Sequence, residues 1–593
     1  MIKHFKKLIT LMTTLFLVIN MITATAFAAV KDGTYTGKSS GNGGDIEVEV
    51  VIKDQRIAEI NTIHSQETKG LGEGALEKIQ KAIIANNTVN VDTISGATDS
   101  SQGYIDAVKE ALKAAGATED DFMSGEMIKH SFVLDKEEYT FDVVVLGGGG
   151  AGLSSAVEAA NLGASVVVVE KSSAIGGNTA VSGGAFNVPG SDLQKNKCIE
   201  DSVEKYIEDT LKGGDELSDP ELVKLLGENA LSAYEWMRDV IHAEFIPDRV
   251  QQFGGHSTPR SVVPIGNKGI ELTDKLWAAA EAKGAQLFLD TKATELIQEN
   301  GTVVGVKVEN NGKEIIINAN KGVIVATGGF AANVEMREKY NAAYGSQYLT
   351  TAVPASTGDG ITMCENIGAQ LVDMEQIQVY PTCNPLTGII SYVANARFDG
   401  ALLINQEGQR FINESGRRDE ISNAILEQPG GYAYLVWGQE IETVGNMTQV
   451  HKNEFEELKK NNLLFEAATL EELAATVEMD AAKLAETVAK FNGYVPDKND
   501  PDFNKTGAYR TIAEGPFYIQ KVMPATHHTM GGVKINTNAQ VLDTEGNPIP
   551  NLFAAGEVVG GIHGTNRLGG NAITDIIVFG RIAGVNAVNG VAE

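Results

Sequence analysis

Residues 141–152 read Phe-Asp-Val-Val-Val-Leu-Gly-Gly-Gly-Gly-Ala-Gly, an apolar run that ends in a glycine-rich turn. The apolar run predicts a buried strand, and the composition of Leu153–Leu162 predicts a helix directly after the turn. Gly147, Gly149 and Gly152 have the G-x-G-x-x-G spacing, which lets the backbone approach a pyrophosphate whose charge is stabilised at the start of the helix. Strand, turn and helix together predict a dinucleotide-binding domain.

The sequence after this helix continues the same pattern. Ser165–Val169 predicts the next strand, and Glu170 follows it at the position from which an acidic side chain accepts hydrogen bonds from an adenosine ribose. Gln286–Leu289 and Gly322–Ala326 predict further strands of an α/β fold. The chain has no second G-x-G-x-x-G fingerprint, which argues against a nicotinamide dinucleotide as the direct electron donor.

The N-terminal segment has the pattern of an export sequence. Three lysines among the first seven residues precede an apolar run from Leu8 to Ile22 and the small-residue sequence Ala26-Phe27-Ala28. This pattern predicts a signal peptide over residues 1–28 that is cleaved after Ala28. We therefore expect a secreted or extracytoplasmic protein, at the cell surface or in the periplasm. The alternative is an uncleaved membrane anchor, because residues 8–29 are just long enough to span a bilayer.

Charge and cysteine content exclude several classes of function. The 593 residues carry a formal net charge of −30, which argues against nucleic acid or an anionic membrane as a partner. The three cysteines, Cys198, Cys364 and Cys383, are an odd number with wide spacing, so they predict no disulfide framework. The chain has no haem-attachment or iron–sulfur motif. The sequence therefore predicts no metal site and no metal-based electron relay.

Composition and periodicity predict an α/β protein with several domains. The predicted boundaries are a small N-terminal α+β domain at 31–118, an acidic linker at 119–138, a Rossmann-like dinucleotide domain at 139–375 and 522–593, and an inserted α+β capping domain at 376–521. In the first domain, alternating apolar residues predict a half-buried strand at Asp45–Ile52. The capping domain is expected to carry the substrate.

The N-terminal domain contains the motif Asp92-Thr93-Ile94-Ser95-Gly96-Ala97-Thr98 between two predicted helices. The motif resembles that of FMN-binding domains in secreted flavoproteins, where a flavin transferase esterifies a threonine with the phosphate of FMN. The resemblance implies covalent FMN on Thr98, and a covalent bond prevents loss of a cofactor that a secreted protein could not recapture. The alternative is an ordinary Ser/Gly turn.

Three motifs in the second half of the chain resemble those of the soluble fumarate reductase family. They are Asn413–Asp419 (Asn-Glu-Ser-Gly-Arg-Arg-Asp), His527–Gly532 (His-His-Thr-Met-Gly-Gly) and His563–Ala572 (His-Gly-Thr-Asn-Arg-Leu-Gly-Gly-Asn-Ala). The resemblance extends from about residue 139 to the C-terminus and implies non-covalent FAD. The residues it implies for FAD binding are Gly147, Gly149, Gly150, Ala151, Gly152, Glu170, Lys171, Gly177, Asn178, Thr179, Gly183, Gly184, Thr327, Gly328, Asp359, Glu557, Asn571, Ala572 and Ile573.

The same resemblance assigns the chemistry. In this family the arginine before the aspartate of the first motif is the proton donor, here Arg418, and the substrate carboxylate is held by two residues that correspond to His527 and Arg567. A guanidinium matches a carboxylate with two parallel hydrogen bonds, and the clamp withdraws electron density so that a conjugated C=C bond accepts hydride. The residues expected to be catalytic are Arg418, Arg567, His527 and Arg397. The candidates for a relay that reprotonates Arg418 are Arg397 and Asp419.

The sequence departs from the fumarate-reducing pattern where that family holds a second carboxylate. Tyr380-Pro381-Thr382 replaces a His-Pro-Thr segment, and Val393 and Ala394 replace a Thr-Glu pair. A carboxylate buried there without a partner costs several kcal/mol, so we expect fumarate to be a poor substrate. Tyr380 resembles urocanate-reducing members of the family, and Asn395 stands where they have an aspartate facing the imidazole. The residues expected to bind substrate are Tyr380, Asn395, His527, Arg567 and Gly570.

The sequence thus predicts an FAD-dependent ene-reductase that acts on a CH–CH group in anaerobic respiration, with FMN relaying electrons. Urocanate-like, cinnamate-like and methacrylate-like acids stay open as substrates, and an aryl acrylate is favoured. The external donor is expected to be a membrane quinol-oxidising system or a redox shuttle. The alternatives are a fumarate reductase, a ketosteroid or enone reductase of the same fold, an electron-transfer flavoprotein without enzymatic activity, and an oxidase such as aspartate oxidase. Retention of the carboxylate clamp argues against the enone alternative.

Overall fold

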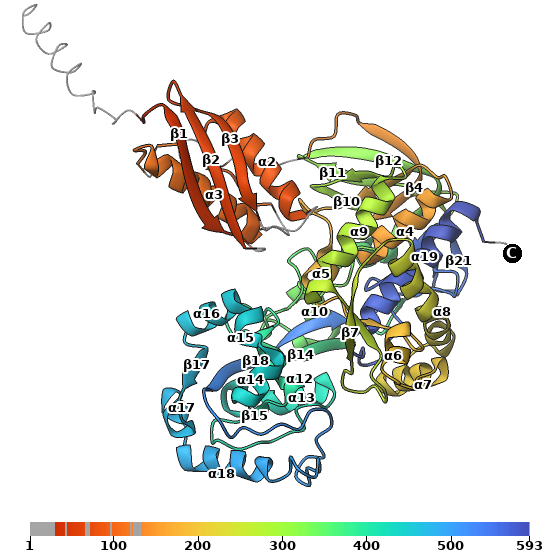
Figure 1. Cartoon of the computed structure of the whole chain (residues 1–593). Helices are drawn as coiled ribbons and strands as arrows, with labels where there is room; N and C mark the ends of the chain where they lie inside the picture. Colours follow the sequence, from red (N-terminus) through yellow and green to blue (C-terminus); the bar gives the residue numbers. More distant parts are fainter. Residues whose placement is uncertain are drawn as a thin grey trace, which may run out of the picture. The chain divides into compact units, whose positions relative to one another are not determined.

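The computed structural model describes residues 30–41, 44–65, 71–94, 98–118, 121–122, 127 and 132–591. The predicted signal peptide and the Ser95-Gly96-Ala97 part of the N-terminal motif lie outside the described residues. The chain divides into two compact units, Met1–Ser131 and Phe132–Glu593, each with its own sheets and helices (Figure 1). Each unit is described by itself below.

The described residues of the N-terminal unit form a three-stranded antiparallel sheet and two helices. Its elements are β1 (Gly33–Ser40), β2 (Asp45–Lys53), β3 (Arg56–Ser65), α2 (Leu71–Asn86) and α3 (Thr98–Ala114). Every second residue of β2 is buried, as the alternating pattern predicted. Helix α3 lies close against β1, because a Cβ atom at Gly37 would lie 2.0 Å from the carbonyl oxygen of Ala107. Thr98, the expected FMN attachment residue, is the first residue of α3.

The main sheet of the second unit is built around the strand that the sequence singled out. Its path is β10-β11-β12-β4-β5-β9, and β21 pairs with both β12 and β20. Strands β12, β4, β5, β9 and β21 run parallel, whereas β10, β11 and β12 form an antiparallel meander. The bounds are β4 (Glu138–Leu146), β5 (Val166–Val169), β9 (Gln286–Phe288), β10 (Thr291–Glu299), β11 (Thr302–Asn310), β12 (Lys313–Val325), β20 (Gln540–Leu542) and β21 (Pro548–Ala554). The α/β fold with a Rossmann-like parallel core is confirmed.

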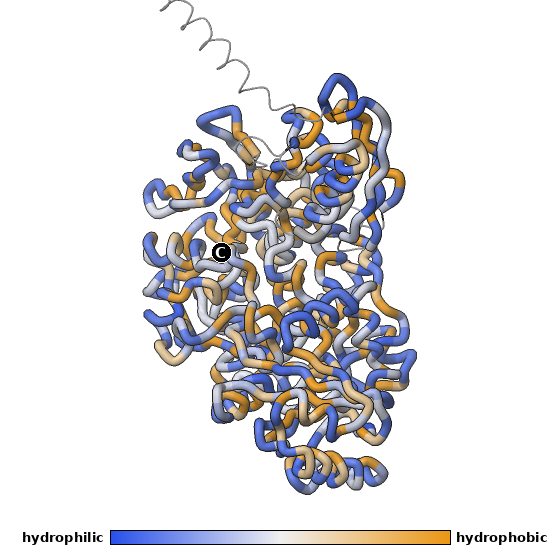
Figure 2. The backbone as a smooth tube through the Cα atoms, turned by 90° about the vertical axis from the view of Figure 1, so that its left-hand side faces the viewer, coloured by the Kyte–Doolittle hydropathy of each residue, from blue (hydrophilic) through white to orange (hydrophobic). Residues whose placement is uncertain are grey.

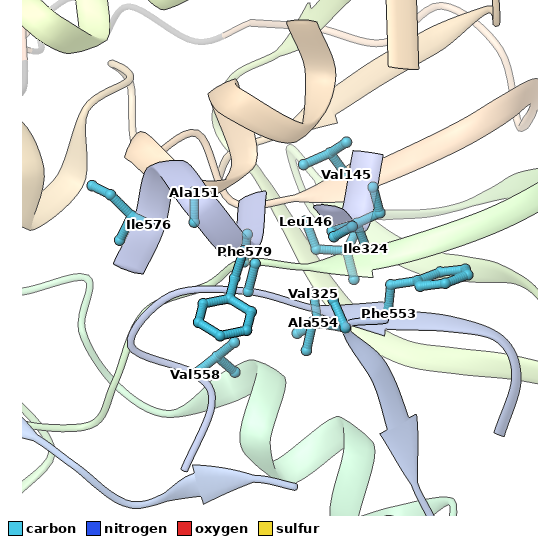
Figure 3. Packing of buried hydrophobic residues seen from close by; sticks show 14 of the residues in the cluster. Val145, Leu146, Ala151, Ile324, Val325, Phe553, Ala554, Val558, Ile576 and Phe579 are labelled. Carbon is cyan, nitrogen blue, oxygen red and sulfur yellow. The ribbon is translucent and has the colours of Figure 1, made fainter. Parts of the chain in front are cut away.

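Helices α4 (Gly150–Asn161), α9 (Ile270–Glu281) and α19 (Asn571–Asn589) pack on this core. Glycines in α19 allow close contact with α4, since a Cβ atom at Gly580 would lie 2.6 Å from the carbonyl oxygen of Ala151. Figure 3 shows Ala151 beside Ile576 and Phe579 of α19, near the ends of the central strands. By length and composition α19 could cross a membrane, but 67% of its 18-residue apolar window is buried inside the protein. Hydrophobic and hydrophilic residues alternate in short stretches along the chain (Figure 2).

Smaller elements surround the core. They are α5 (Gly177–Val181), β6 (Phe186–Asn187), α6 (Asp192–Asn196), α7 (Val203–Gly213), α8 (Pro220–Asp239), β7 (Phe245–Gln251), β8 (Ser261–Pro264), α10 (Val334–Tyr340), α11 (Asp359–Asn366), β13 (Leu371–Val372) and β19 (Gly532–Val533). Strands β6, β8 and β7 form a small antiparallel sheet.

A second hydrophobic core lies in the capping domain, called the cap below, whose elements run from β14 to β18. Its sheet has the order β14-β18-β16-β15, with β17 also paired to β18. The bounds are β14 (Ile377–Cys383), η3 (Val393–Asn395), α12 (Ala396–Asp399), β15 (Leu402–Ile404), α13 (Arg418–Leu426), β16 (Ala433–Trp437), α14 (Gln439–Gly445), α15 (Met447–Val450), α16 (Lys452–Lys460), β17 (Leu464–Ala467), α17 (Leu470–Thr476), α18 (Ala481–Asn492) and β18 (Phe517–Thr529). Strand β18 crosses from this cap back to the dinucleotide domain, and the expected boundary between residues 521 and 522 falls within it.

Candidate active site

One cavity of about 1020 Å³ joins the glycine-rich turn to the cap. The predicted site residues that line it are Gly147, Gly149, Gly150, Ala151, Glu170, Lys171, Gly177, Asn178, Thr179, Gly183, Gly184, Thr327, Gly328, Asp359, Tyr380, Asn395, Arg418, His527, Glu557, Arg567, Gly570, Ala572 and Ile573. Gly152, Arg397 and Asn571 lie behind the lining, and Thr98 belongs to the other unit. Residues scattered over more than 400 positions of sequence are therefore brought together.

The turn between β4 and α4 has the geometry of a phosphate site. Gly147 has φ of +105°, and a Cβ atom there would lie 2.3 Å from the carbonyl oxygen of Ala326, so the strand end demands glycine. Gly149 borders open space, with only the Gly176 carbonyl oxygen within 4 Å of an added Cβ. Gly149 is also the N-cap of α4 and has no side chain to cap it, although Gly150 N donates to Thr179 Oγ1 at 3.2 Å. The N-terminal end of a helix favours a phosphate.

Polar side chains continue along the cavity from this turn. Glu170 accepts hydrogen bonds from the backbone of Gly148 and of Ser172, both at 2.8 Å. Lys171 Nζ lies 2.6 Å from Asp359 Oδ2, an ion pair that fixes this side of the cavity. The open glycine turn, the uncapped helix and the acidic residue after β5 all fit a dinucleotide, and FAD is the one that the family motifs imply.

Around Glu557, hydrogen bonds tie the cap strand to the dinucleotide domain. Its carboxylate accepts from Thr529 N at 3.0 Å and from Asn178 Nδ2 at 3.2 Å, and burial raises its pKa. His528 Nδ1 lies 3.7 Å from the same carboxylate. The end of β18 is thereby fixed beside the flavin-binding loops, which positions His527 as well.

Arg567 is a buried cation with little to neutralise it. Only 5% of its surface is exposed, its Nη1 donates a long bond of 3.4 Å to Leu568 O, and its Nε has no partner among the described residues. Burial, with repulsion from Arg418, lowers the pKa of Arg567 to about 9. Its backbone is held by Gln378, whose Nε2 donates to Arg567 O at 2.8 Å. The side chain is thus positioned without being paired.

Arg418 begins α13 and lies against aromatic rings. Its guanidinium carbon lies 4.9 Å from the centre of the Tyr380 ring and 5.8 Å from that of Phe253. The side chain of Arg418 forms no hydrogen bond or ion pair with any other described residue, and burial lowers its pKa. The N-terminal end of a helix also disfavours a cation. Gly569 makes room for this arrangement, since a Cβ atom there would lie 3.0 Å from Arg418 Nη2.

His527 completes the cluster. Its Nδ1 lies 2.7 Å from Thr351 Oγ1, and its ring centre lies 5.1 Å from that of Tyr380. Burial and the neighbouring cations Arg567 and Arg418 hold its pKa well below the ordinary value, so the imidazole is neutral. Sequence reasoning missed Thr351, because nothing in its local sequence points to the histidine 176 residues away.

The two relay candidates differ in their surroundings. Arg397 is buried and donates from Nη1 to Glu414 O at 3.0 Å. Burial lowers its pKa, and Tyr380 offsets part of this shift. Asp419 instead pairs with Arg417, with Oδ2 lying 2.9 Å from Nη2, and this arginine also binds Asp215. The relay candidate Asp419 therefore forms no hydrogen bond with Arg418 among the described residues, because its carboxylate is bonded to Arg417.

The cap wall corrects one part of the sequence interpretation. Val393 and Ala394, expected at the second carboxylate position of the pocket, are buried in the cap core instead. The cavity is lined by their neighbours Tyr392 and Asn395 and, one helical turn later, by Asp399. The side chains of Asn395 and Asp399 form no hydrogen bond or ion pair with any described residue, and burial raises the pKa of Asp399.

Further residues that the sequence did not identify line the same end of the cavity: Arg249, Phe253, Phe398 and Met447. Phe253 and Phe398 meet edge to face, with ring centres 5.8 Å apart. Burial lowers the pKa of Arg249, and the attraction of the Asp399 carboxylate offsets part of this shift. They belong to β7, to the loop before β8, to α12 and to α15, and none of these stretches carries a motif that could have revealed them.

The geometry agrees with comparisons to known proteins. The sequence matches the FAD binding domain family over residues 142–573 and the FMN-binding domain family over residues 41–113. It is 43% identical to a urocanate reductase from Eggerthella lenta over 562 residues, which are 93% of this chain and 92% of that protein. The chain belongs to this family of flavoprotein reductases. It is an FAD-dependent reductase with an additional FMN-binding domain.

Two other members show how widely the family architecture is used. The chain is 36% identical to an NADH:fumarate oxidoreductase from Klebsiella pneumoniae over 94% of its own length, and it spans 59% of that longer protein. Among solved structures, the open conformation of a flavocytochrome c3 fumarate reductase superposes with a TM-score of 0.64 at 37% identity, covering 76% of this chain and 78% of that one. The two flavin-binding domains of this chain rest on the two family matches, and the solved structure supports the fold over 76% of the chain.

Proposed function

We propose that this protein reduces the C=C bond of an α,β-unsaturated carboxylate, with an aryl acrylate of the urocanate or cinnamate type as its substrate. One observation carries the proposal. Arg567 and Arg418 line the same cavity and, among the described residues, form no ion pair with any carboxylate. Two such cations in a buried site are stabilised by an anionic ligand, and a carboxylate matches the fork of a guanidinium.

The residues divide the work of binding and protonation. Arg567 and His527 hold the substrate carboxylate, and the Thr351 hydroxyl donating to His527 Nδ1 leaves Nε2–H as the donor toward substrate. When bound in the glycine-lined part of the cavity, FAD supplies the hydride. Arg418 delivers the proton to the α-carbon, and its lowered pKa makes a guanidinium a better acid than in water. Arg397 lies behind Tyr380 as the candidate that returns the proton.

An aryl group suits the remaining walls. Tyr380, Phe253 and Phe398 surround the space beyond Arg418 with aromatic rings. Asn395 and Asp399 add a hydrogen-bonding edge at the cap side, and their free side chains favour a ring with an N–H, such as imidazole, over a phenyl ring. The relative at 43% identity is named a urocanate reductase, which supports this choice.

Fumarate is the second candidate, and Arg249 is the observation that favours it. This arginine lines the cavity and could meet a second carboxylate. Asp399 opposes that role, since it lines the same cavity and its carboxylate would repel a second substrate carboxylate. We therefore place fumarate below the aryl acrylates.

The electron path is proposed from the motifs. We infer that FMN is esterified to Thr98 by a flavin transferase and passes electrons to FAD from a membrane quinol-oxidising system or a redox shuttle. The N-terminal residues favour an extracytoplasmic enzyme, with cleavage after Ala28, that serves anaerobic respiration. Such an enzyme needs a signal peptide for export, a covalent bond that keeps its flavin, and an electron donor outside the chain.

A substrate panel tests the proposed function. Purified holoprotein is given dithionite-reduced methyl viologen, and oxidation of the dye is followed with urocanate, cinnamate, methacrylate and fumarate at equal concentration. Fast oxidation with an aryl acrylate and slow oxidation with fumarate is the expected result. Rapid turnover with fumarate alone would refute the pocket argument, and no turnover with any of the four acids would refute the reductase assignment for this substrate class.

A further inference from the structure

Glu454 of α16 lies in the cap behind the cavity wall and is bonded to one short turn. Its Oε1 accepts from Ser391 Oγ at 2.5 Å, and its Oε2 accepts from the backbone N–H of Tyr392 at 3.1 Å and of Val393 at 3.3 Å. These are the residues at which the helical run η3–α12 begins. The carboxylate thereby acts as an N-terminal cap that comes from a different helix.

The run that Glu454 caps forms part of the cavity wall. It carries Asn395 and Asp399, which line the cavity, and Arg397, which lies behind Tyr380. At its start, Tyr392 lines the cavity too and donates its hydroxyl to Val181 O in the dinucleotide domain, at 2.6 Å. The position of the whole wall therefore depends on where the turn at residues 391–393 is held.

Other contacts to this turn are uncharged. Gln520 Nε2 donates to Ser391 Oγ at 2.7 Å, and the Tyr392 ring stacks on His451 with ring centres 5.4 Å apart. The charged or titratable groups that act on Glu454 or on this stack are Glu457 on the same helix, the phenols of Tyr392 and Tyr380, His451, Lys268 and Arg249. Among the described residues no cation forms an ion pair with Glu454. The carboxylate is thus the one charged group bonded to the turn in the described structure.

We propose that Glu454 is a positioning residue of the active site, which holds the Ser391–Asp399 wall in the geometry that binds the aromatic end of the substrate. The inference rests on the proposed function for its kinetic consequence, but its structural part does not. Glu454 touches neither the cavity nor the reacting groups, so it acts through Tyr392 and Asn395. Weaker hydrogen bonds from Glu454 to this turn are therefore expected to raise KM for the substrate more than they lower kcat.

Protonation of the Glu454 carboxylate is a second way to weaken its hydrogen bonds to the turn. Burial, offset in part by Ser391 and the two backbone N–H groups, raises the pKa of Glu454 to about 7. An ionised carboxylate makes charge-assisted bonds about twice as strong as those of the neutral acid. The bonds to Tyr392 N and Val393 N are therefore at full strength above pH 7 and weaken as the pH falls through 7.

Three variants test the proposal in the holoenzyme. Glu454→Gln keeps the shape and removes the charge, Glu454→Ala removes the acceptors, and Glu456→Gln removes an exposed charge from the same helix as the matched control. With reduced viologen as donor, Glu454→Gln is expected to raise KM for the aryl acrylate about tenfold with kcat within about twofold. Glu454→Ala is expected to exceed that effect, and the control to match the wild type. In the wild type KM rises below pH 7, and in Glu454→Gln this rise is lost.

Amide hydrogen exchange tests the structural part without turnover. Peptides that contain residues 391–395 are expected to exchange faster in Glu454→Gln than in the wild type or Glu456→Gln at pH 8. Unchanged exchange in Glu454→Gln, or an equal fall in kcat and kcat/KM with KM unchanged, overturns the proposal. If the wild type reduces no acrylate while exchange changes as expected, the proposed function fails and the positioning role of Glu454 stands.

Discussion

Arg567→Met is the substitution whose consequences the structure specifies most fully. Methionine has a similar length and fills the same space without a charge. If Arg567 clamps the substrate carboxylate, the variant loses two charge-assisted hydrogen bonds, each contributing about 1.5–3 kcal/mol. Together they amount to about 3–6 kcal/mol, which corresponds to a fall in kcat/KM of about 10²- to 10⁴-fold. Arg567→Lys keeps the charge but not the fork, so its loss is expected to be smaller.

Stability should change in the opposite direction. Burial lowers the pKa of Arg567 from 12.5 to about 9, so keeping it charged costs the folded protein about 5 kcal/mol at neutral pH. Because the folded pKa lies below the unfolded one, this cost is complete below pH 9 and is relieved between pH 9 and 12.5. Arg567→Met removes the cost, and we expect its thermal midpoint to rise by a few degrees at pH 7.

The assay pairs both readouts on one preparation. Steady-state kinetics with reduced viologen and urocanate or cinnamate give kcat/KM, and thermal unfolding followed by flavin fluorescence gives the midpoint. A loss of activity together with a higher thermal midpoint supports the interpretation that Arg567 binds the substrate carboxylate at the expense of stability. An active variant, or an inactive one that is also strongly destabilised with FAD lost, would refute the clamp.

Three further predictions concern single residues. Arg418→Ala should lower kcat at least about 10²-fold while FAD stays bound, because a general acid contributes about 10²–10⁴ in rate; an unchanged kcat shows that another group is the acid. Asp399→Asn should lower kcat/KM for urocanate about tenfold and leave cinnamate unchanged, as measured on the same preparation; equal effects on both would contradict a role at the ring. Thr98→Ala should remove FMN from the intact mass and abolish activity with the physiological donor, yet retain viologen activity; an FMN adduct that persists places the attachment elsewhere.

The dinucleotide part of the fold was predictable because local sequence determines it. A run of buried valines, the glycine spacing and Glu170 each depend on residues within about 30 positions of one another, and the strand, turn and helix are found as expected. Glycine at 147 is required by contacts at the turn itself, and Gly149 keeps the space beside the turn open. The alternating strand of the N-terminal unit was predictable for the same reason.

The cap wall was not predictable in the same way. Which of the residues 392–395 face the cavity depends on how η3 starts, and Glu454, about 60 residues later, determines that start. Val393 and Ala394 therefore pack inward, while Tyr392 and Asn395 line the cavity. The pairing of Asp419 with Arg417 also depends on tertiary structure, since Arg417 is held by an ion pair with Asp215, about 200 residues earlier in the chain. Contacts of this kind leave no local pattern.

The central claim is that a single-carboxylate clamp with an aromatic wall selects an aryl acrylate. Stopped-flow measurement of the reoxidation of reduced FAD in the holoprotein tests it most directly, because it observes one turnover without any donor. We predict rapid reoxidation by urocanate or cinnamate and a rate with fumarate at least about 100-fold slower, because the second carboxylate of fumarate would be buried at the end of the cavity that Asp399 lines. Reoxidation by fumarate as fast as by either aryl acrylate would contradict the account.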